Sequence, residues 1–310
     1  MNNKKKILIT GGCGFIGSNL ASELVKKNFT IHILDKNIKN KIQNKNIIYF
    51  KGNIKNLKSF DNFRYKYEAV FHLAAQSSAR ICEENFKEAI NTNFIGTLNL
   101  CNWAKIYKPK KVIFSSSMTV YKSSKFALHE NETLKPNSIY GKTKVESEKM
   151  IRGLKKYNII TFITRLFNVY GPGQSYENLK QGMVSIYAYY AVIDKKIKVT
   201  GSLDRFRDLI YISDVTNTYI KLLKLNKSIT INVGTGKKIT VKELLKLICK
   251  LTNLNFTRTI KILSSHSGDI FGTYASTNRL FKIYRPKISL TNGLLKIIKD
   301  IKKFQKIKIN

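Results

Sequence analysis

The chain has 310 residues, with 56 lysines and arginines against 19 acidic residues, so its formal net charge is +37. A hydrophobic fraction of 43% can form a large core and excludes a chain that is disordered throughout. The sequence has no run of about 18 apolar residues and no signal-peptide pattern, and its four cysteines lack the paired spacing of a zinc site or a disulfide framework. We therefore expect a cytoplasmic protein that binds no metal.

The excess of lysine invites an interpretation as a nucleic-acid-binding protein. However, the lysines are spread along the chain, and isoleucine and asparagine, whose codons are also rich in A and T, are abundant as well. We interpret the charge as a compositional background on a solvated surface, and we expect no nucleic-acid partner.

The first part of the chain alternates short apolar segments with helix-length segments. Strands are predicted at residues 6–10, 30–35, 47–51, 69–73, 111–115 and 159–166. Helices are predicted between them at residues 15–27, 83–107 and 138–157. Apolar strands separated by helices indicate a parallel sheet that is covered on both faces.

The second half of the chain is less regular. Helices are predicted at residues 179–193, 213–225 and 241–251, and a basic helix from residue 292 onward. This basic helix is amphipathic, so it could contact a membrane surface, but such helices more often pack their apolar face on their own domain. We expect the second half to form a smaller lobe.

A glycine-rich loop joins the first strand to the first helix. The loop and the helix start supply five candidate cofactor-binding residues: Gly11, Gly14, Phe15, Ile16 and Gly17. The glycines allow a tight turn and close approach of the backbone to a pyrophosphate at the positive end of the helix. Asp35 ends the next strand, where a carboxylate accepts the ribose hydroxyls and repels a 2′-phosphate. The pattern predicts a Rossmann-type doubly wound sheet that binds NAD, with Lys36 keeping NADP as the alternative.

With these motifs the sequence resembles the extended short-chain dehydrogenase/reductase family, in its NAD-dependent nucleotide-sugar epimerase/dehydratase branch, over residues 5–299. The resemblance implies further cofactor-binding residues: Asn53, Ile54, Leu73, Ala74, Ala75, Asn93, Ser115, Tyr140, Lys144 and Phe167. Asn53 stands where the family has an aspartate, so it keeps an acceptor for the adenine but loses the charge.

The resemblance also implies three catalytic residues: Ser117, Tyr140 and Lys144. Tyr140 and Lys144 are four residues apart and share one face of a helix. A free tyrosine, with a pKa of about 10, is a poor base at neutral pH. A nearby ammonium and a positive nicotinamide favour the phenolate, which would lower the pKa of Tyr140 toward the working range. Ser117 is expected to hydrogen-bond the same substrate hydroxyl.

The residues before Tyr121 discriminate between reactions. Dehydratases and decarboxylases of the family place acidic residues there, whereas this chain has Ser117, Met118 and Thr119. Because Met118 is neither an acid nor a base, we expect a 4-epimerase of a UDP-hexose or UDP-N-acetylhexosamine, working through a 4-keto intermediate with transient NADH. The alternatives are a reductase, a dehydratase, an epimerase at another carbon or, more distantly, a non-catalytic relative that binds NAD or RNA.

The nucleotide-sugar substrate is expected to contact four residues: Ser117, Asn168, Arg207 and His266. The planar fork of Arg207 suits a diphosphate. His266 stands where the family has a second arginine; it would donate a weaker, pH-dependent hydrogen bond or be an ordinary surface histidine. The small Thr273 is expected to leave room for a 2-N-acetyl group.

The same resemblance divides the chain by function. Residues 1–170, with about 206–235 returning to them, are the predicted NAD-binding Rossmann domain. Residues 171–205 and 236–310 are the predicted C-terminal α/β substrate-binding lobe. The family also implies a homodimer, which the helices at 83–107 and 138–157 would form.

Overall fold

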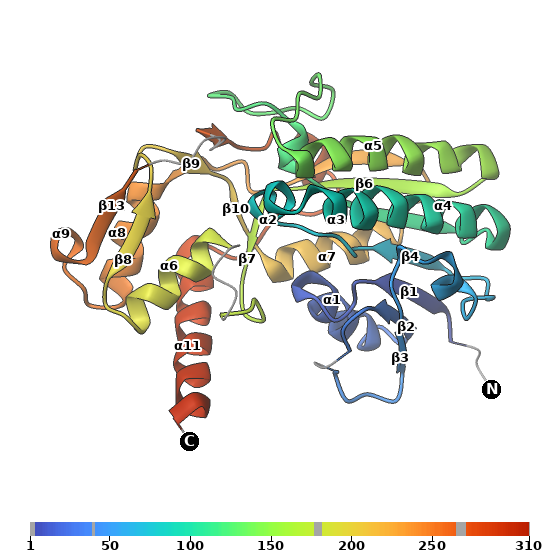
Figure 1. The fold of residues 1–310 in the computed structure, drawn as a ribbon, viewed down its shortest axis with the longest axis horizontal. Helices are drawn as coiled ribbons and strands as arrows, with labels where there is room; N and C mark the ends of the chain where they lie inside the picture. Colours follow the sequence, from blue (N-terminus) through green and yellow to red (C-terminus); the bar gives the residue numbers. More distant parts are fainter. Residues whose placement is uncertain (1–3, 39–40, 177–181, 265–270, 310) are drawn as a thin grey trace. The chain divides into compact units, whose positions relative to one another are not determined.

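A computed structural model describes residues 4–38, 41–176, 182–264 and 271–309 (Figure 1). The strands of the described residues are β1 (Lys6–Thr10), β2 (Thr30–Asp35), β3 (Ile47–Lys51), β4 (Ala69–His72), β5 (Lys111–Ser117), β6 (Ile160–Leu166), β7 (Asn168–Tyr170), β8 (Ile197–Thr200), β9 (Phe206–Arg207), β10 (Leu209–Tyr211), β11 (Ile229–Val233), β12 (Ile239–Thr240), β13 (Ile260–Leu263) and β14 (Gly272–Thr273). The α-helices are α1 (Phe15–Val25), α2 (Ala79–Glu84), α3 (Phe86–Ile90), α4 (Gly96–Tyr107), α5 (Ile139–Gly153), α6 (Met183–Val192), α7 (Ile212–Leu222), α8 (Val241–Leu251), α9 (Phe256–Thr259), α10 (Asn278–Phe281) and α11 (Leu290–Ile309).

The chain forms two compact units. The first unit comprises Met1–Tyr121, Thr133–Leu166 and Thr216–Ile231, and the second comprises Lys122–Glu132, Phe167–Val215 and Asn232–Asn310. Of the segment expected to return to the first domain, about 206–235, residues 216–231 belong to the first unit. The assignment of one domain to NAD and the other to substrate stays a prediction.

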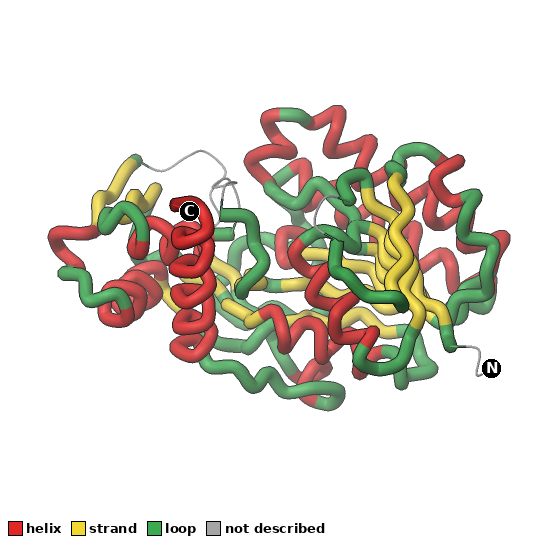
Figure 2. The backbone as a smooth tube through the Cα atoms, turned by 90° about the horizontal axis from the view of Figure 1, so that it is seen from below, coloured by secondary structure: helices red, strands yellow, loops and turns green. Residues whose placement is uncertain are grey.

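The first unit is built on a seven-stranded sheet with the order β11-β6-β5-β4-β1-β2-β3. The neighbouring pairs from β6 to β3 are all parallel. Helices cover both faces of the sheet (Figure 2), with α4 and α5 on one face and α1 and α7 on the other (Figure 1). The predicted doubly wound α/β sheet is confirmed. Strand order reverses between β1 and β4, and ligands bind such sheets at the carboxyl ends of the strands beside this switch point.

Burial on both faces explains why the strands read as continuous apolar runs. Ile7, Leu8 and Ile9 follow one another in β1, and each is fully buried. One face of the sheet carries a cluster that includes Leu8, Val70, Val112 and Trp103. Because neither face of the sheet is solvated, alternation of polar and apolar residues is not required.

The predicted single helix over residues 83–107 is wrong. The segment forms α2 and α3, then a π-helical turn over Asn91–Ile95, and only then α4. Asn85 interrupts the first turn because its side chain accepts a hydrogen bond from the Glu88 N–H and begins a new helix. A π-turn inserts one residue and rotates the side chains that follow, which is frequent at functional sites.

The described residues of the second unit form short strands in three small sheets, with the orders β10-β7, β12-β9-β14 and β13-β8. Helix α8 begins with a capping box in which Thr240 and Glu243 bond each other's backbone N–H groups. Helix α11 packs against α6, and its apolar residues Leu294, Ile297 and Ile301 are fully buried. The C-terminal helix therefore covers its own domain, as expected from its pattern. No described helix combines the length and the apolar character needed to cross a bilayer.

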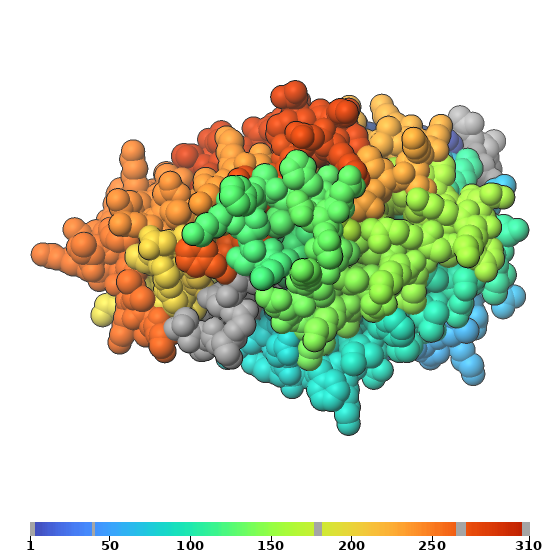
Figure 3. Space-filling view, turned by 90° about the horizontal axis from the view of Figure 1, so that it is seen from above, coloured from blue at the N-terminus to red at the C-terminus, as the bar shows by residue number. Residues whose placement is uncertain are grey.

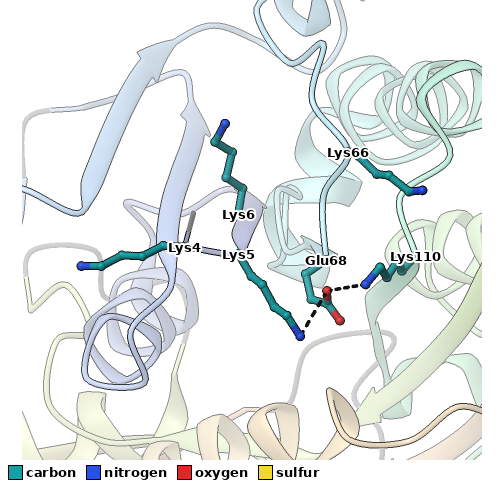
Figure 4. Close-up of a pocket in the computed structure, with 6 residues that line it drawn as sticks. All are labelled: Lys4, Lys5, Lys6, Lys66, Glu68 and Lys110. Carbon is teal, nitrogen blue, oxygen red and sulfur yellow. Dashed lines mark hydrogen bonds and ion pairs between the residues drawn. The ribbon is translucent and has the colours of Figure 1, made fainter. Parts of the chain in front are cut away.

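A group of lysines lies at the amino ends of β1, β4 and β5, the end of these strands opposite the glycine loop. Five lysines and Glu68 line an open cavity of about 270 Å³ there: Lys4, Lys5, Lys6, Lys66 and Lys110 (Figure 4). Only Lys5 and Lys110 turn toward Glu68, at 3.8 and 2.9 Å, while the other three point apart. Burial would raise the pKa of the Glu68 carboxyl, but the hydrogen bond and charge of Lys110 outweigh it and hold the pKa below its ordinary value. These lysines do not converge on a common point as the ligands of one anion would.

Candidate active site

The glycine loop lies at the carboxyl end of β1, at the switch point of the sheet. Gly11 has φ +74°, and a Cβ there would lie 2.7 Å from the backbone of Ala74. A Cβ on Gly17 would lie 2.3 Å from the Gly11 carbonyl oxygen, so α1 can pack against the loop only with glycine. No side chain caps Gly14, which is the N-cap of α1. The loop is therefore a close-packed cradle that leaves the first N–H groups of α1 to a phosphate.

Asp35 borders this cradle at the end of β2. Its Oδ2 accepts a hydrogen bond from the Cys13 N–H at 2.9 Å, and its Oδ1 accepts one from the Asn37 N–H at 3.0 Å. The carboxylate is thus oriented by the loop that would hold the pyrophosphate. It keeps further lone pairs for a ribose hydroxyl, because an ionised carboxylate has about four acceptor sites.

The loop over Leu73–Gln76 is positioned by buried groups on either side of it. His72 is buried, with its Nδ1 2.7 Å from the Thr10 hydroxyl and its Nε2 3.0 Å from the Thr97 hydroxyl. Burial lowers the pKa of His72 to about 3, and the charge of Lys144 adds to this, so the imidazole is neutral. It serves as a fixed polar link between β1, β4 and α4.

Asn93, in the π-turn, hydrogen-bonds the loop over Leu73–Gln76. Its Oδ1 accepts from the Gln76 N–H at 2.8 Å, and its Nδ2 donates to the Gln76 carbonyl and to the Thr143 hydroxyl, each at 3.1 Å. These hydrogen bonds of the Asn93 side chain therefore go to the loop and to α5. The expected contact of Asn93 with the cofactor stays a prediction.

Asn53 and Ile54 follow β3. Asn53 Oδ1 accepts from the Lys55 N–H at 3.1 Å, which fixes the turn. Ile54 is buried, and a Cβ on Gly96 would lie 2.4 Å from its Cδ1, so the start of α4 packs directly against it. Their proposed adenine contacts stay predictions.

Ser117, Tyr140 and Lys144 come together between β5 and α5. The Ser117 and Tyr140 hydroxyls hydrogen-bond each other, and Ser117 Oγ also accepts from the Thr119 hydroxyl at 3.0 Å. Lys144 Nζ donates to the Ser115 carbonyl at 2.8 Å and lies 5.6 Å from the centre of the Tyr140 ring. The spacing in the sequence predicted that Tyr140 and Lys144 share one face of a helix. The structure adds that this face lies against the serines at the end of β5.

The electrostatics of this pair differ from the expectation. Burial raises the pKa of the Tyr140 phenol well above its ordinary value, the neighbouring Cys82 thiol adds to the rise, and the Ser117 hydrogen bond opposes it. Burial also lowers the pKa of the Lys144 ammonium to about 8, against the opposing charges of Cys82 and Glu148. The expected lowering of the Tyr140 pKa is thus wrong for the chain by itself, because desolvation of a buried phenolate outweighs its hydrogen bond.

Of the residues expected to contact substrate, Asn168 and Arg207 lie in the second unit, whereas Ser117 lies in the first. Asn168 donates from its backbone N–H and its side chain to the Asp208 carbonyl, at 3.0 and 3.2 Å. Arg207 and Thr273 are register partners on β9 and β14, and Thr273 is fully buried. Burial lowers the pKa of Arg207 to about 10, with the charge of Arg205 adding to the effect.

Two more residues are expected to make contacts, His266 with the substrate and Phe167 with the cofactor. His266 lies outside the described residues. Phe167 is buried in the second unit, where its N–H donates to the Val233 carbonyl at 3.0 Å. Its cofactor contact stays a prediction.

Sequence reasoning missed two groups around Tyr140 and Lys144. Cys82 is buried in one cluster with Tyr140. Glu148 and Arg165 form a buried ion pair at 2.8 Å behind Lys144. A glutamate four residues after the lysine, and an arginine within an apolar strand, were the signals available, since charges are almost never fully buried without a partner.

A doubly wound sheet with a glycine cradle at its switch point and a buried Tyr–Lys pair beside it defines an enzyme of the short-chain dehydrogenase/reductase class. Residues 7–234 match the model of the NAD dependent epimerase/dehydratase family. The chain belongs to this family of nucleotide-sugar enzymes, and its cofactor is NAD.

Individual relatives catalyse different reactions. The dTDP-4-dehydro-6-deoxyglucose reductase of Escherichia coli is 30% identical, covering 96% of this chain and 98% of its own. The UDP-N-acetyl-alpha-D-glucosaminuronate decarboxylase of Bacillus cytotoxicus is 32% identical over 81% of each chain. The structure of UDP-glucose 4-epimerase from Thermotoga maritima, solved with UDP-glucose, has a TM-score of 0.91 at 27% identity and covers 97% of this chain and 99% of its own.

Proposed function

We propose that the protein is a nucleotide-sugar 4-epimerase that acts on a UDP-hexose or a UDP-N-acetylhexosamine. The observation that carries the proposal is the side-chain set around Tyr140. Tyr140, Lys144 and Ser117 supply a proton acceptor, a cation and a relay hydroxyl, while Met118 and Thr119 add no carboxylate next to them. An elimination of water needs a further acid and base, and this stretch provides neither.

The cradle fits NAD, because it can approach a pyrophosphate closely and its acidic border suits a ribose without a 2′-phosphate. Gly11, Gly14 and Gly17 would hold the pyrophosphate, and Asp35 the adenosine ribose. When bound, NAD supplies a hydride acceptor and donor for sugar C4 and a positive charge near Tyr140.

Tyr140 handles the proton. Because burial keeps the phenol protonated in the chain by itself, ionisation needs positive charge nearby, and the Lys144 ammonium supplies one fixed charge. The phenolate takes the proton of the sugar 4-hydroxyl, with Ser117 bonding the same oxygen. It returns the proton after the 4-keto sugar has presented its other face.

We also propose that Asn168 and Arg207 bind the diphosphate, which would hold the nucleotide while the sugar turns. Arginine can bind two phosphate oxygens at once. We propose in addition that the small Thr273, the register partner of Arg207, allows a 2-N-acetyl group on the sugar. An enzyme that epimerised UDP-glucose but ignored UDP-N-acetylglucosamine would contradict this role of Thr273.

The experiment is incubation of the purified protein with a panel of nucleotide sugars, without added cofactor, followed by analysis of the products. The proposal predicts the 4-epimer of at least one UDP-sugar. Tyr140→Phe should abolish turnover while the thermal unfolding curve is retained. A product that forms only with stoichiometric NAD(P)H would identify a reductase instead.

We further propose a homodimer formed by α4 and α5, which lie side by side on one face (Figure 3). Phe86 and Ile90 of α3 and Ile106 of α4 are exposed near this surface, at 49%, 41% and 71%. Sedimentation analysis should give a dimer, and Ile106→Glu should weaken it; a monomer at micromolar concentration would contradict the proposal.

A further inference from the structure

Helix α5 carries a third buried polar side chain, Glu148, on the same face as Tyr140 and Lys144. Tyr140, Lys144 and Glu148 are spaced by four residues, and Glu148 is fully buried. Its Oε1 accepts from the Ser116 hydroxyl at 2.6 Å and from Arg165 Nε at 2.9 Å. Its Oε2 accepts from Arg165 Nη2 and from Arg152 Nη2, each at 2.8 Å. The carboxylate is thus fully engaged by groups of the protein.

Arg165 is as deeply buried as its partner. It lies on β6 with 2% of its surface exposed, and its Nη1 donates to the Tyr121 hydroxyl at 2.8 Å. Burial alone would lower the pKa of the Arg165 guanidinium, but the hydrogen bonds and charge of Glu148 outweigh it and hold the pKa above its ordinary value. Ser116 and Arg165 are register partners on β5 and β6, so one carboxylate from α5 ties two neighbouring strands together.

Strand β5 contacts helix α5 through three consecutive residues, Ser115, Ser116 and Ser117. The Ser115 carbonyl accepts from Lys144, the Ser116 hydroxyl donates to Glu148, and the Ser117 hydroxyl bonds Tyr140. A slide of α5 by one residue moves it by about 1.5 Å, which is enough to break all three contacts. Because all three side chains lie on one helix, the contact made by Glu148 also fixes the positions of Tyr140 and Lys144 along β5.

A buried ion pair is weak evidence of stabilisation, because removing two charges from water costs about as much as their attraction returns, and apolar replacements are often as stable. Such pairs are better attested as devices that fix register. Here the register in question is that of the helix carrying Tyr140 on the strand carrying Ser117.

We propose that Glu148 and Arg165 are positioning residues, which set the register of α5 on β5 and thereby place the Tyr140 hydroxyl and the Lys144 ammonium beside Ser117. The inference rests on the proposed roles of Tyr140 and Lys144. It adds that the geometry of this pair depends on an ion pair that touches neither substrate nor cofactor.

Glu148 also affects the charge of the Lys144 ammonium. The titratable groups that face Lys144 come from three elements: Tyr140 and Glu148 on α5, Cys82 on α2 and His72 on β4. His72 is neutral, and the Cys82 thiol, whose pKa burial raises to about 11, is also uncharged at neutral pH. Glu148 is therefore the carboxylate among these groups that supports the Lys144 ammonium.

The test compares NAD-loaded Glu148→Gln with Glu146→Gln, a matched control on the same helix whose exposed carboxylate pairs with Lys149 at 2.8 Å. Two readouts are used: kcat and KM for the accepted nucleotide sugar, and the phenolate titration of Tyr140, obtained by subtracting the absorbance of Tyr140→Phe in each background. Glu148→Gln should lower kcat by about 100-fold with little change in KM, as expected for a misplacement of about 1 Å. It should also raise the Tyr140 pKa, and Glu146→Gln should change neither readout.

Because Glu148→Gln removes the carboxylate that neutralises the buried Arg165 charge, this variant can fail to fold, so Glu148→Met with Arg165→Met provides an apolar pair of similar size. This variant should unfold like the wild type while kcat stays low and the phenolate titration stays shifted. Wild-type kcat and titration in the folded double variant would overturn the proposal and leave the proposed epimerase standing. Conversely, a wild-type enzyme that epimerises no sugar, with a titration that still shifts in the variants, would overturn the proposed function and support the positioning role.

Discussion

Replacement of Gly17 by alanine separates two effects of the same methyl group. Alanine is the better helix former by about 1 kcal/mol, so the change should stabilise α1 if space were available. Space is absent: the new Cβ would lie 2.3 Å from the Gly11 carbonyl oxygen and 2.6 Å from Gly12 Cα. Both are backbone atoms, so the loop or the helix must move by about 1 Å, and overpacking of this kind costs about 1 to 3 kcal/mol.

The displaced group is the N-terminus of α1, which faces the proposed pyrophosphate. We expect Gly17→Ala to lower the free energy of unfolding and, independently, to weaken NAD binding by tenfold or more, since about 1.4 kcal/mol is a factor of ten. Gly153→Ala is the matched control, because Gly153 is also helical but a Cβ there meets nothing within 4 Å. It should stabilise the protein by about 0.4 to 1 kcal/mol and leave NAD binding unchanged.

Denaturant unfolding without nucleotide and calorimetric titration with NAD measure the two effects. The reasoning is refuted if Gly17→Ala is as stable as Gly153→Ala and binds NAD with wild-type affinity. A loss of stability in both variants would show instead that the helix ends, and not the cradle, are sensitive to a methyl group.

Three further predictions concern charged residues. Asp35→Asn should weaken NAD binding by about tenfold, since hydrogen bonds to a charged group contribute about 1.5 to 3 kcal/mol, and should narrow the preference over NADP; an unchanged ratio of the two dissociation constants would contradict the role of Asp35. Burial lowers the pKa of Lys144 in the folded protein to about 8, against 10.5 for a free lysine, so the cost of charging the buried amine is absent above pH 10.5 and fully present below pH 8. In nucleotide-free protein the unfolding free energy of the wild type, relative to Lys144→Met, should therefore rise by about 3 kcal/mol across this window, whereas parallel curves would show that the lysine is not desolvated. Asp208, fully buried, accepts from the Thr235 N–H at 2.7 Å and the Gly236 N–H at 2.9 Å; Asp208→Asn should cost about 2 to 3 kcal/mol in chemical unfolding, because an amide must turn a donor toward one of these donors, and a neutral effect would mean that the loop rearranges freely.

The regular parts of the fold were predictable because their causes are local. The strands β1, β2 and β3 begin and end at the predicted residues, since their apolar runs are bounded by polar turns. The same holds for α8, whose capping box lies in the sequence itself. The segment 79–95 was not predictable, because its breaks serve contacts with Gln76 and Thr143, which are distant in sequence from Asn93.

The candidate site divides in the same way. Spacing predicted that Tyr140 and Lys144 share a face, and the structure adds that both are buried, at 8% and 3% exposure. The raised pKa of Tyr140 in the chain by itself was not predictable, because it depends on desolvation by the elements packed against α5, among them α2 and β5. Glu148 and Arg165 were missed because a carboxylate on a helix reads as a solvated charge until a strand partner is known.

The most direct test of the proposed epimerase follows the hydrogen at sugar C4. A UDP-hexose or UDP-N-acetylhexosamine that carries deuterium at C4 is incubated with the protein in ordinary water, without added cofactor, and the product is analysed by mass and NMR. We expect the 4-epimer to form with deuterium retained at C4, since the hydrogen removed from one face returns to the other. Loss of the label to solvent, or its appearance at another carbon, would contradict 4-epimerisation by this site.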